Sequence, residues 1–246
     1  MEVCLEVGTR YNAYSLFMKK YLFFLISNFL LFFIFPIIRL LSKKFYEKRI
    51  LPHLINMTCS SKPIQIQKKK IIPNAYGKVL EIGFGSGVNL KLYNGENVEK
   101  IYGIDPSQEL HVLAYENAKS VDISIDLQIG SAEELPFEDN SFDTVVSTYS
   151  LCSIPNPEIA LNEISRVLKS SGKFYFAEHG LSSDTRVANF QNFIEFFYPK
   201  ISGGCHVNRD ILKLINNSEL ELKVSQSMYL PGTQKFLGFN SWGTAG

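Results

Sequence analysis

The stretch VLEIGFGSG, residues 79–87, constrains the fold of this chain more than any other feature. An apolar run that ends in an acid and three alternating glycines predicts a buried β-strand turning sharply into a helix. Gly83 and Gly85 can adopt backbone angles closed to other residues, so a ligand can approach the main chain closely. Asp105 ends the next apolar run, and a carboxylate about 20 residues after such a loop typically binds a ribose. We therefore expect the chain to bind a cofactor of adenosine type.

The bulk properties bound the class of protein. A length of 246 residues allows one α/β domain with an appendage, and the net charge of +1 gives no support for nucleic acid as a partner. The four cysteines are scattered without a CxxC pair. A disulfide framework and a metal site are therefore not expected, and a reducing compartment fits better.

The N-terminal segment 21–38 carries no charge, and Leu40 and Leu41 extend its apolar character. That length approaches what a helix needs to cross a bilayer, although Pro36 is expected to kink or end the helix. We expect a membrane anchor through residues 21–41, spanning or inserted as a hairpin; a signal peptide or a soluble packing helix are the alternatives. The heavier basic flank that follows predicts a cytoplasmic catalytic domain.

The chain is expected to divide into residues 1–50 (anchor and basic flank), 51–75 (connector) and 76–246 (catalytic domain). Lys68, Lys69 and Lys70 lie in the connector. They are expected either to contact anionic headgroups or to be part of a solvated linker.

Beyond the connector, strand and helix patterns alternate, which predicts a parallel sheet with helices on both faces. Strands are expected at 78–82, 100–104, 123–129, 142–148 and 173–178, and helices at 86–93, 107–119, 157–169 and 184–199. Runs 219–226 and 234–240 predict a closing antiparallel hairpin.

Asn156 is expected to cap the 157–169 helix and Gly172 to end it. Asp210 is expected to cap a later helix. Phe190, Phe193 and Phe197 share a helix face, which favours core packing over a substrate wall.

The glycine spacing selects among adenosine cofactors. A dinucleotide site usually has G-x-G-x-x-G with the pyrophosphate at a helix N-terminus, which disfavours an NAD-dependent reductase. This chain has G-x-G-x-G, and the Glu81 carboxylate before it would repel a phosphate. A carboxylate beside bare main chain suits a cofactor with an ammonium group and no phosphate, such as S-adenosylmethionine (SAM).

Four blocks, VLEIGFGSG, GIDPS, GSAEELPFEDNSFD and EISRVLKSSGKFYFAEH, resemble consecutive motifs of class I SAM-dependent methyltransferases. STYSLCSI, GKFYFAEH and GGCHVNRD (203–210) resemble the membrane-anchored thiol S-methyltransferase branch of that family. The resemblance implies a Rossmann-like, doubly wound sheet of about seven strands with a C-terminal antiparallel hairpin.

The resemblance also implies residue roles. The implied cofactor-binding residues are Glu81, Gly83, Phe84, Gly85, Asp105, Pro106, Ser107, Ser131, Ala132, Glu133 and Thr148. Many class I enzymes have Asp at the position of Ser131, and Glu133 is an alternative partner for the adenine amino group. Tyr149 and Cys205 are assigned to the substrate side.

Methyl transfer from a sulfonium mainly requires alignment and exclusion of water. A thiol acceptor is partly ionised at neutral pH, so a general base is optional. The candidates for proton transfer or acceptor orientation are Glu178, His179 and His206; a structural role for His179 is equally compatible with the sequence. Cys152 is expected to be a small buried hydrophobe.

The expected function is methyl transfer from SAM to a small apolar acceptor at a membrane, and an alkyl thiol is the favoured acceptor. Methylation of a lipid or quinone headgroup is the alternative among enzymes. A non-catalytic SAM-binding membrane adaptor is the alternative from another class. The acceptor and the oligomeric state stay open.

Overall fold

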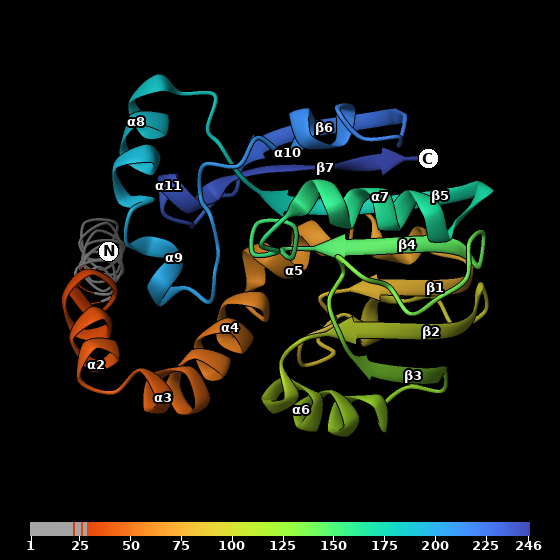
Figure 1. Ribbon diagram of the computed structural model, residues 1–246, viewed down its shortest axis with the longest axis horizontal. Coiled ribbons are helices and arrows are strands. Elements are labelled where there is room, and N and C mark those ends of the chain that lie inside the picture. The colour runs from red at the N-terminus through yellow and green to blue at the C-terminus, as the bar shows by residue number, and fades with distance from the viewer. Residues whose placement is uncertain (1–21, 23–25, 27–28) are drawn as a thin grey trace, which may run out of the picture. The chain divides into compact units, whose positions relative to one another are not determined.

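The computed structural model describes Leu22, Ile26 and residues 29–246. The chain forms two compact units, Met1–Ile50 and Leu51–Gly246. The second unit contains a seven-stranded sheet in the order β3-β2-β1-β4-β5-β7-β6 (Figure 1). This strand order, with a reversal beside β1, is that of an open doubly wound α/β sheet, as expected from the sequence.

The first five strands pair in parallel, whereas β7 pairs antiparallel with both β5 and β6. The strands are β1 (Gly77–Ile82), β2 (Val98–Asp105), β3 (Ser124–Ile129), β4 (Phe142–Thr148), β5 (Leu168–His179), β6 (Leu222–Tyr229) and β7 (Phe239–Ala245). Because the carboxyl ends of parallel strands share one edge, Glu81, Asp105, Thr148 and His179 are brought to that edge.

Apolar residues cover both faces of the sheet. Leu80 and Phe174 belong to one core cluster, which includes the inner face of α7 (Pro157–Val167). Val79 and Tyr175 belong to the other cluster. Successive strand residues point to opposite faces, so β1, β2, β4 and β5 each supply both cores, whereas the edge strand β3 supplies only the second.

The second unit also contains short helices. They are α4 (Leu51–Cys59), α5 (Lys62–Lys68), η3 (Ile72–Asn74), η4 (Leu90–Leu92), α6 (Gln108–Ala118), α7, α8 (Thr185–Ile194), α9 (Tyr198–Ile201), α10 (Ile211–Asn216) and α11 (Lys235–Gly238). Residues 51–75 are thus largely helical, and α5 lies at the carboxyl end of β4 (Figure 1). Lys68, the last residue of α5, places its Nζ 5.9 Å from the centre of the Tyr149 ring.

The described part of the first unit is helical as well. It contains η1 (Leu30–Ile34), α2 (Phe35–Leu41), α3 (Lys43–Phe45) and η2 (Tyr46–Ile50). Pro36 does not end the helix: the π-helical turn η1 ends at Ile34, directly before α2, and Pro36 lies in the first turn of α2. Within the described residues, no helix combines the length and apolar character needed to cross a membrane. Most of the uncharged segment before Phe29 lies outside the described residues.

Several helix predictions need correction. The expected helix at 86–93 is only the 3₁₀ turn η4, because Gly87 is left-handed (φ 72°) and the side chains of Asn89 and Tyr93 turn toward Glu81. The helix at 157–169 ends at Val167, since Leu168 is already extended and pairs with Phe142. Gly172 consequently lies within β5 and does not end the helix.

Asn156 makes no capping hydrogen bond to α7 with its side chain; its Nδ2 and its amide both donate to Glu133 Oε1. Asp210 does cap α10, as predicted, by accepting from the Lys213 amide.

The expected helix at 184–199 is divided into α8 and α9, with Pro199 in the first turn of α9. The predicted core packing of its phenylalanines is wrong for Phe190 and Phe193, which are 42% and 75% exposed. The buried face of α8 carries Gln191 instead, which accepts from the Ser182 amide and donates to the Gly180 and Phe236 carbonyls. The closing antiparallel pair exists, but residues 235–238 are helical and the last strand runs 239–245.

Candidate active site

The turn after β1 requires glycine for a steric reason. Gly83 has φ of 68°, and a Cβ there would lie 2.0 Å from Ser150 Oγ. Gly85 has φ of 57°, yet the nearest atom to its Cβ position is 3.8 Å away. Gly83 therefore fixes the contact between the loops after β1 and β4, whereas Gly85 leaves open space beside the main chain.

Glu81 is the centre of a buried polar network. Its side chain accepts hydrogen bonds from Asn89 Nδ2 (2.7 Å) and Tyr93 Oη (2.7 Å), and Asn89 Nδ2 also donates to Thr148 Oγ1 (2.9 Å). Burial raises the pKa of Glu81 to about 7, against the effect of these hydrogen bonds and of Lys68. Asn89 Oδ1 is buried without a partner in the described part of the chain. A carboxylate beside a vacant amide acceptor suits a ligand with an ammonium group.

Asp105 stands at the end of the neighbouring strand and holds the glycine loop. Its Oδ2 accepts from the Gly85 amide (2.9 Å) and its Oδ1 from the Ser107 amide (2.8 Å). Burial raises the pKa of Asp105, and its charge contributes to the raised pKa of Glu81. Glu81 and Asp105 thus lie near each other, joined by the glycine loop. Each Asp105 oxygen retains a lone pair for a further donor.

The other residues assigned to the cofactor lie around this edge and differ in their contacts. Phe84 packs in the core over Gly103, and its amide donates to the Ile104 carbonyl. Pro106 is exposed, and Ser107 caps α6 by accepting from the Leu110 amide.

The segment 131–133, which is expected to contact the adenine, is held by local hydrogen bonds. Ser131 Oγ donates to Glu133 Oε2, and Glu133 Oε1 accepts from the amide and side chain of Asn156. Ala132 is buried in the core. The carboxylate of Glu133 is therefore shared between two protein partners.

The burial of Lys68 contradicts the expectation that it lies in a solvated linker. It is 2% exposed, whereas Lys69 and Lys70 are exposed. Burial lowers the pKa of Lys68, opposed by the attraction of Cys59, Glu81 and Glu178. A buried cation among acidic groups is a candidate partner for a ligand carboxylate.

The loop after β4 is organised by Glu178, at the carboxyl end of β5. Glu178 Oε1 accepts from Ser147 Oγ (2.9 Å) and from the amides of Ser150 (3.0 Å) and Leu151 (3.2 Å). Tyr149 has a positive φ of 56°, a strained conformation for this residue type, and its hydroxyl donates to Asn240. Glu178, predicted as catalytic, is engaged in holding this strained turn.

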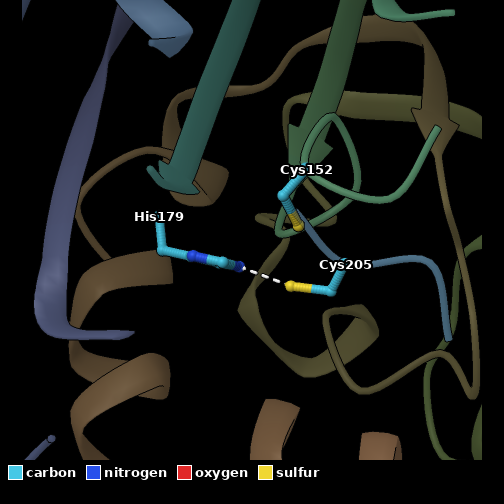
Figure 2. A group of neighbouring side chains, drawn as sticks. All are labelled: Cys152, His179 and Cys205. Carbon is cyan, nitrogen blue, oxygen red and sulfur yellow. Dashed lines mark hydrogen bonds between the residues drawn. The ribbon is translucent and has the colours of Figure 1, made fainter. Parts of the chain in front are cut away.

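Two cysteines and a histidine meet beside this turn (Figure 2). His179 Nε2 lies 2.9 Å from Cys205 Sγ, and Cys152 Sγ belongs to the same group. His206, the third predicted catalytic residue, points elsewhere and pairs with Glu195, while its amide donates to the Cys152 carbonyl. The structure therefore joins His179 and Cys205 and separates them from the His206 side chain.

Sequence reasoning missed Asn89, Tyr93 and Lys68 and treated Cys152 as a plain hydrophobe. Asn89 and Tyr93 follow Glu81 within a few residues, at spacings that carry no motif. Lys68 and Cys152 are far from their partners in the sequence. Only tertiary contacts reveal these four residues.

Comparison with known proteins agrees with this geometry. Residues 80–176 match a family model described as a methyltransferase domain. Residues 80–176 form a class I SAM-dependent methyltransferase domain. SAM is accordingly its cofactor, and the glycine loop, Glu81 and Asp105 all lie within the matched residues.

Three curated relatives of this methyltransferase have different acceptors. It is 29% identical to a phosphatidylethanolamine N-methyltransferase of Cereibacter sphaeroides, over 66% of this chain and 79% of that protein. It is 34% identical to the ubiquinone/menaquinone C-methyltransferase UbiE of Rickettsia bellii, over 53% of this chain and 56% of UbiE. It is 27% identical to the human thiol S-methyltransferase TMT1A, over 65% of this chain and 66% of that protein.

The methyltransferase thus spans little more than half the length of the UbiE relative. Among solved structures, a methyltransferase in complex with the Haloferax volcanii activator Trm112 matches with a TM-score of 0.62 at 19% identity, covering 82% of this chain and 96% of that one. At this identity the likeness supports the fold alone.

Proposed function

We propose that this methyltransferase methylates the sulfur of a small apolar thiol. The observation that carries the proposal is that the three predicted acid–base groups already have protein partners. Glu178 holds the turn after β4, His206 pairs with Glu195, and His179 Nε2 lies 2.9 Å from Cys205 Sγ. An acceptor that ionises readily without a strong base fits such a site better than a carbon acid or an amine. The similarity to TMT1A supports the same acceptor class.

The polar network at the carboxyl edge of the sheet fits the cofactor. We assign the ammonium group to Glu81 and the vacant Asn89 Oδ1, the carboxylate to Lys68, and the ribose hydroxyls to Asp105. When bound, SAM supplies an activated methyl group. The residues of this chain position the two sulfur atoms and exclude water.

The test compares three acceptor classes with the purified full-length chain. Methyl-labelled SAM is supplied with an alkyl thiol, a quinol, or phosphatidylethanolamine in micelles, and the products are identified by mass spectrometry. We expect the thioether and S-adenosylhomocysteine from the thiol alone. Turnover confined to the quinol or the lipid would refute the thiol assignment, and no S-adenosylhomocysteine with any acceptor would favour a non-catalytic SAM-binding adaptor.

Asp105→Ala is expected to weaken SAM binding by about 1–3 kcal/mol, the scale of hydrogen bonds to a charged group. The substitution removes the ribose acceptor and also the partner of the Gly85 and Ser107 amides. Isothermal titration calorimetry measures the loss. Asp126→Ala, which removes an exposed carboxylate paired with Lys100, is the matched control and should bind SAM normally. An unchanged affinity in Asp105→Ala would count against the ribose role.

SAM binding is expected to strengthen as the pH rises toward 7. Because the pKa of Glu81 is raised to about 7, its ionised fraction grows from about 3% at pH 5.5 to about 50% at pH 7. The α-amino group of SAM stays protonated in this window, so Kd should fall about fifteenfold. Calorimetry at both pH values measures the change, and Glu81→Gln should show weak binding without this dependence. Equal affinities of the parent chain at pH 5.5 and 7 would contradict the assignment of Glu81.

We further propose that residues 21–41 attach the enzyme to a membrane, with the catalytic domain in the cytoplasm. Support comes from the uncharged run 21–38 and from α2, where Leu40 and Leu41 are 86% and 80% exposed next to basic Arg39. Residues 1–50 fused to a soluble reporter should stay with membranes after carbonate extraction. The same fusion carrying Phe33→Asp and Ile37→Asp should be released. A parent fusion that is fully extracted would end the anchor proposal.

A further inference from the structure

A compact group of metal-binding side chains lies at the carboxyl edge of the sheet, where the sequence predicted no metal. Cys152 follows β4, His179 ends β5, and Cys205 lies in the loop between α9 and α10 (Figure 2). One ligand atom from each residue lies within 4.8 Å of the other two. Cys152 and His179 are only 2% and 7% exposed.

The three side chains are held in place by contacts outside the group itself. The His206 amide donates to the Cys152 carbonyl (2.8 Å), which fixes the Cys205 loop against the loop after β4. Ser202 Oγ donates to the Cys205 carbonyl (3.2 Å). The Tyr149 ring stacks on the His179 ring with their centres 6.3 Å apart. Such supports hold ligands in a convergent arrangement before a metal binds.

The chemistry of the donor set selects the metal. Two thiol sulfurs and an imidazole nitrogen are ligands for Zn²⁺, whereas Mg²⁺ and Ca²⁺ require oxygen. A carboxylate that would complete a closed structural site is not among the grouped residues. Three protein ligands with an open fourth position are typical of catalytic zinc.

We propose that Cys152, His179 and Cys205 bind one Zn²⁺ ion and that the acceptor thiol occupies its fourth coordination position. The second half of this proposal depends on the proposed thiol methylation; the first half does not. Two thiolates neutralise the ion, so a bound acceptor thiolate leaves the centre with one negative charge. That charge complements the positive sulfonium of SAM.

The transfer balances without a further reactant. The acceptor thiol loses its proton to solvent on binding zinc, because a coordinated thiol is deprotonated. The thiolate sulfur then forms a bond to the methyl carbon, while the bond from that carbon to the sulfonium sulfur breaks. The electron pair of the broken bond stays on that sulfur, giving S-adenosylhomocysteine. The neutral thioether is a weaker ligand than a thiolate and leaves the zinc.

The binding test uses the full-length chain, metal analysis and Co²⁺ as a spectroscopic substitute for Zn²⁺. We expect about one metal per chain and the intense sulfur-to-cobalt charge-transfer absorption of a thiolate site. Cys152→Ser, Cys205→Ser and His179→Gln should each weaken metal binding by more than about 100-fold. Cys59→Ser is the matched control and should bind normally, because Cys59 is outside the group.

The same Co²⁺-loaded chain tests the fourth position without turnover. An alkyl thiol should shift the charge-transfer band, whereas an alcohol of equal chain length should leave it unchanged. A band unaffected by the thiol overturns the assignment of the fourth position.

Other results separate this inference from the proposed function. A metal-free chain that methylates thiols at the full rate would overturn the zinc site and leave thiol methylation standing. A Cys152–Cys205 disulfide found in place of metal in the purified chain would also overturn the zinc site. A chain that binds metal and methylates only quinols or lipids would refute thiol methylation while supporting the metal site.

Discussion

Glu178→Ala is expected to lower the free energy of unfolding by about 2–6 kcal/mol, because it leaves the buried amides of Ser150 and Leu151 without their acceptor. At about 2–4 °C per kcal/mol for a domain of this size, the melting temperature should fall by roughly 10 °C. Thermal denaturation followed by circular dichroism measures the change. A melting temperature within a degree or two of the parent would show that Glu178 does not hold the turn after β4.

Glu178→Gln separates the structural role from the catalytic one that the sequence suggested. The glutamine oxygen can accept hydrogen bonds from the same amides. Burial raises the pKa of Glu178, so the neutral glutamine side chain is a mild change. We expect this variant to melt close to the parent and to retain methyl transfer within about tenfold. A stable Glu178→Gln protein with activity reduced more than about 100-fold would restore the catalytic assignment.

Gly83→Ala is expected to lower the free energy of unfolding by about 2–5 kcal/mol and to abolish SAM binding. The new Cβ would meet Ser150 Oγ at 2.0 Å, and the residue would keep an unfavourable φ of 68°. Denaturant unfolding gives the stability, and calorimetry gives the affinity.

Two variants divide this effect into strain and collision. Gly85→Ala has a similar φ of 57° but no atom within 3.8 Å of its Cβ, so it should cost about 1–2 kcal/mol. Gly83→Ala combined with Ser150→Gly removes the collision and should recover part of the stability, since only the φ strain and the lost hydrogen bond from Ser150 Oγ to the Ile82 carbonyl remain. If Gly83→Ala is no worse than Gly85→Ala, the close approach of the two loops is not what requires glycine.

The sequence predicted the parallel core of the fold well, because each buried strand carries its own local signal. The expected strands at 78–82 and 142–148 correspond to β1 and β4 within a residue at either end. The ends of the helices were less predictable. Val167 and Leu168 are both apolar, and only the pairing of Leu168 with Phe142 ends α7 there.

Residues that interact across long stretches of sequence were invisible to sequence reasoning. Lys68 belongs to a run of lysines that resembles a solvated linker, yet α5 carries it into the interior. Asn156 is a residue type that often caps helices, but its side chain donates a hydrogen bond to Glu133. Phe193 fits an apolar stripe, although the buried position on α8 belongs to Gln191. Each error has one cause: local propensity was outweighed by a tertiary partner.

The sequence by itself determined the glycine turn, the two acids at the ends of adjacent strands, and hence the class of cofactor, since these depend on local backbone geometry and on strand order. Only the tertiary structure decided what surrounds them. It engaged Glu178 and His206 in structural contacts, and it gathered Cys152, His179 and Cys205 from three separate segments. The physical reason is that a parallel sheet brings its carboxyl ends to one edge, and the side chains that meet there depend on loops whose conformation is fixed by packing.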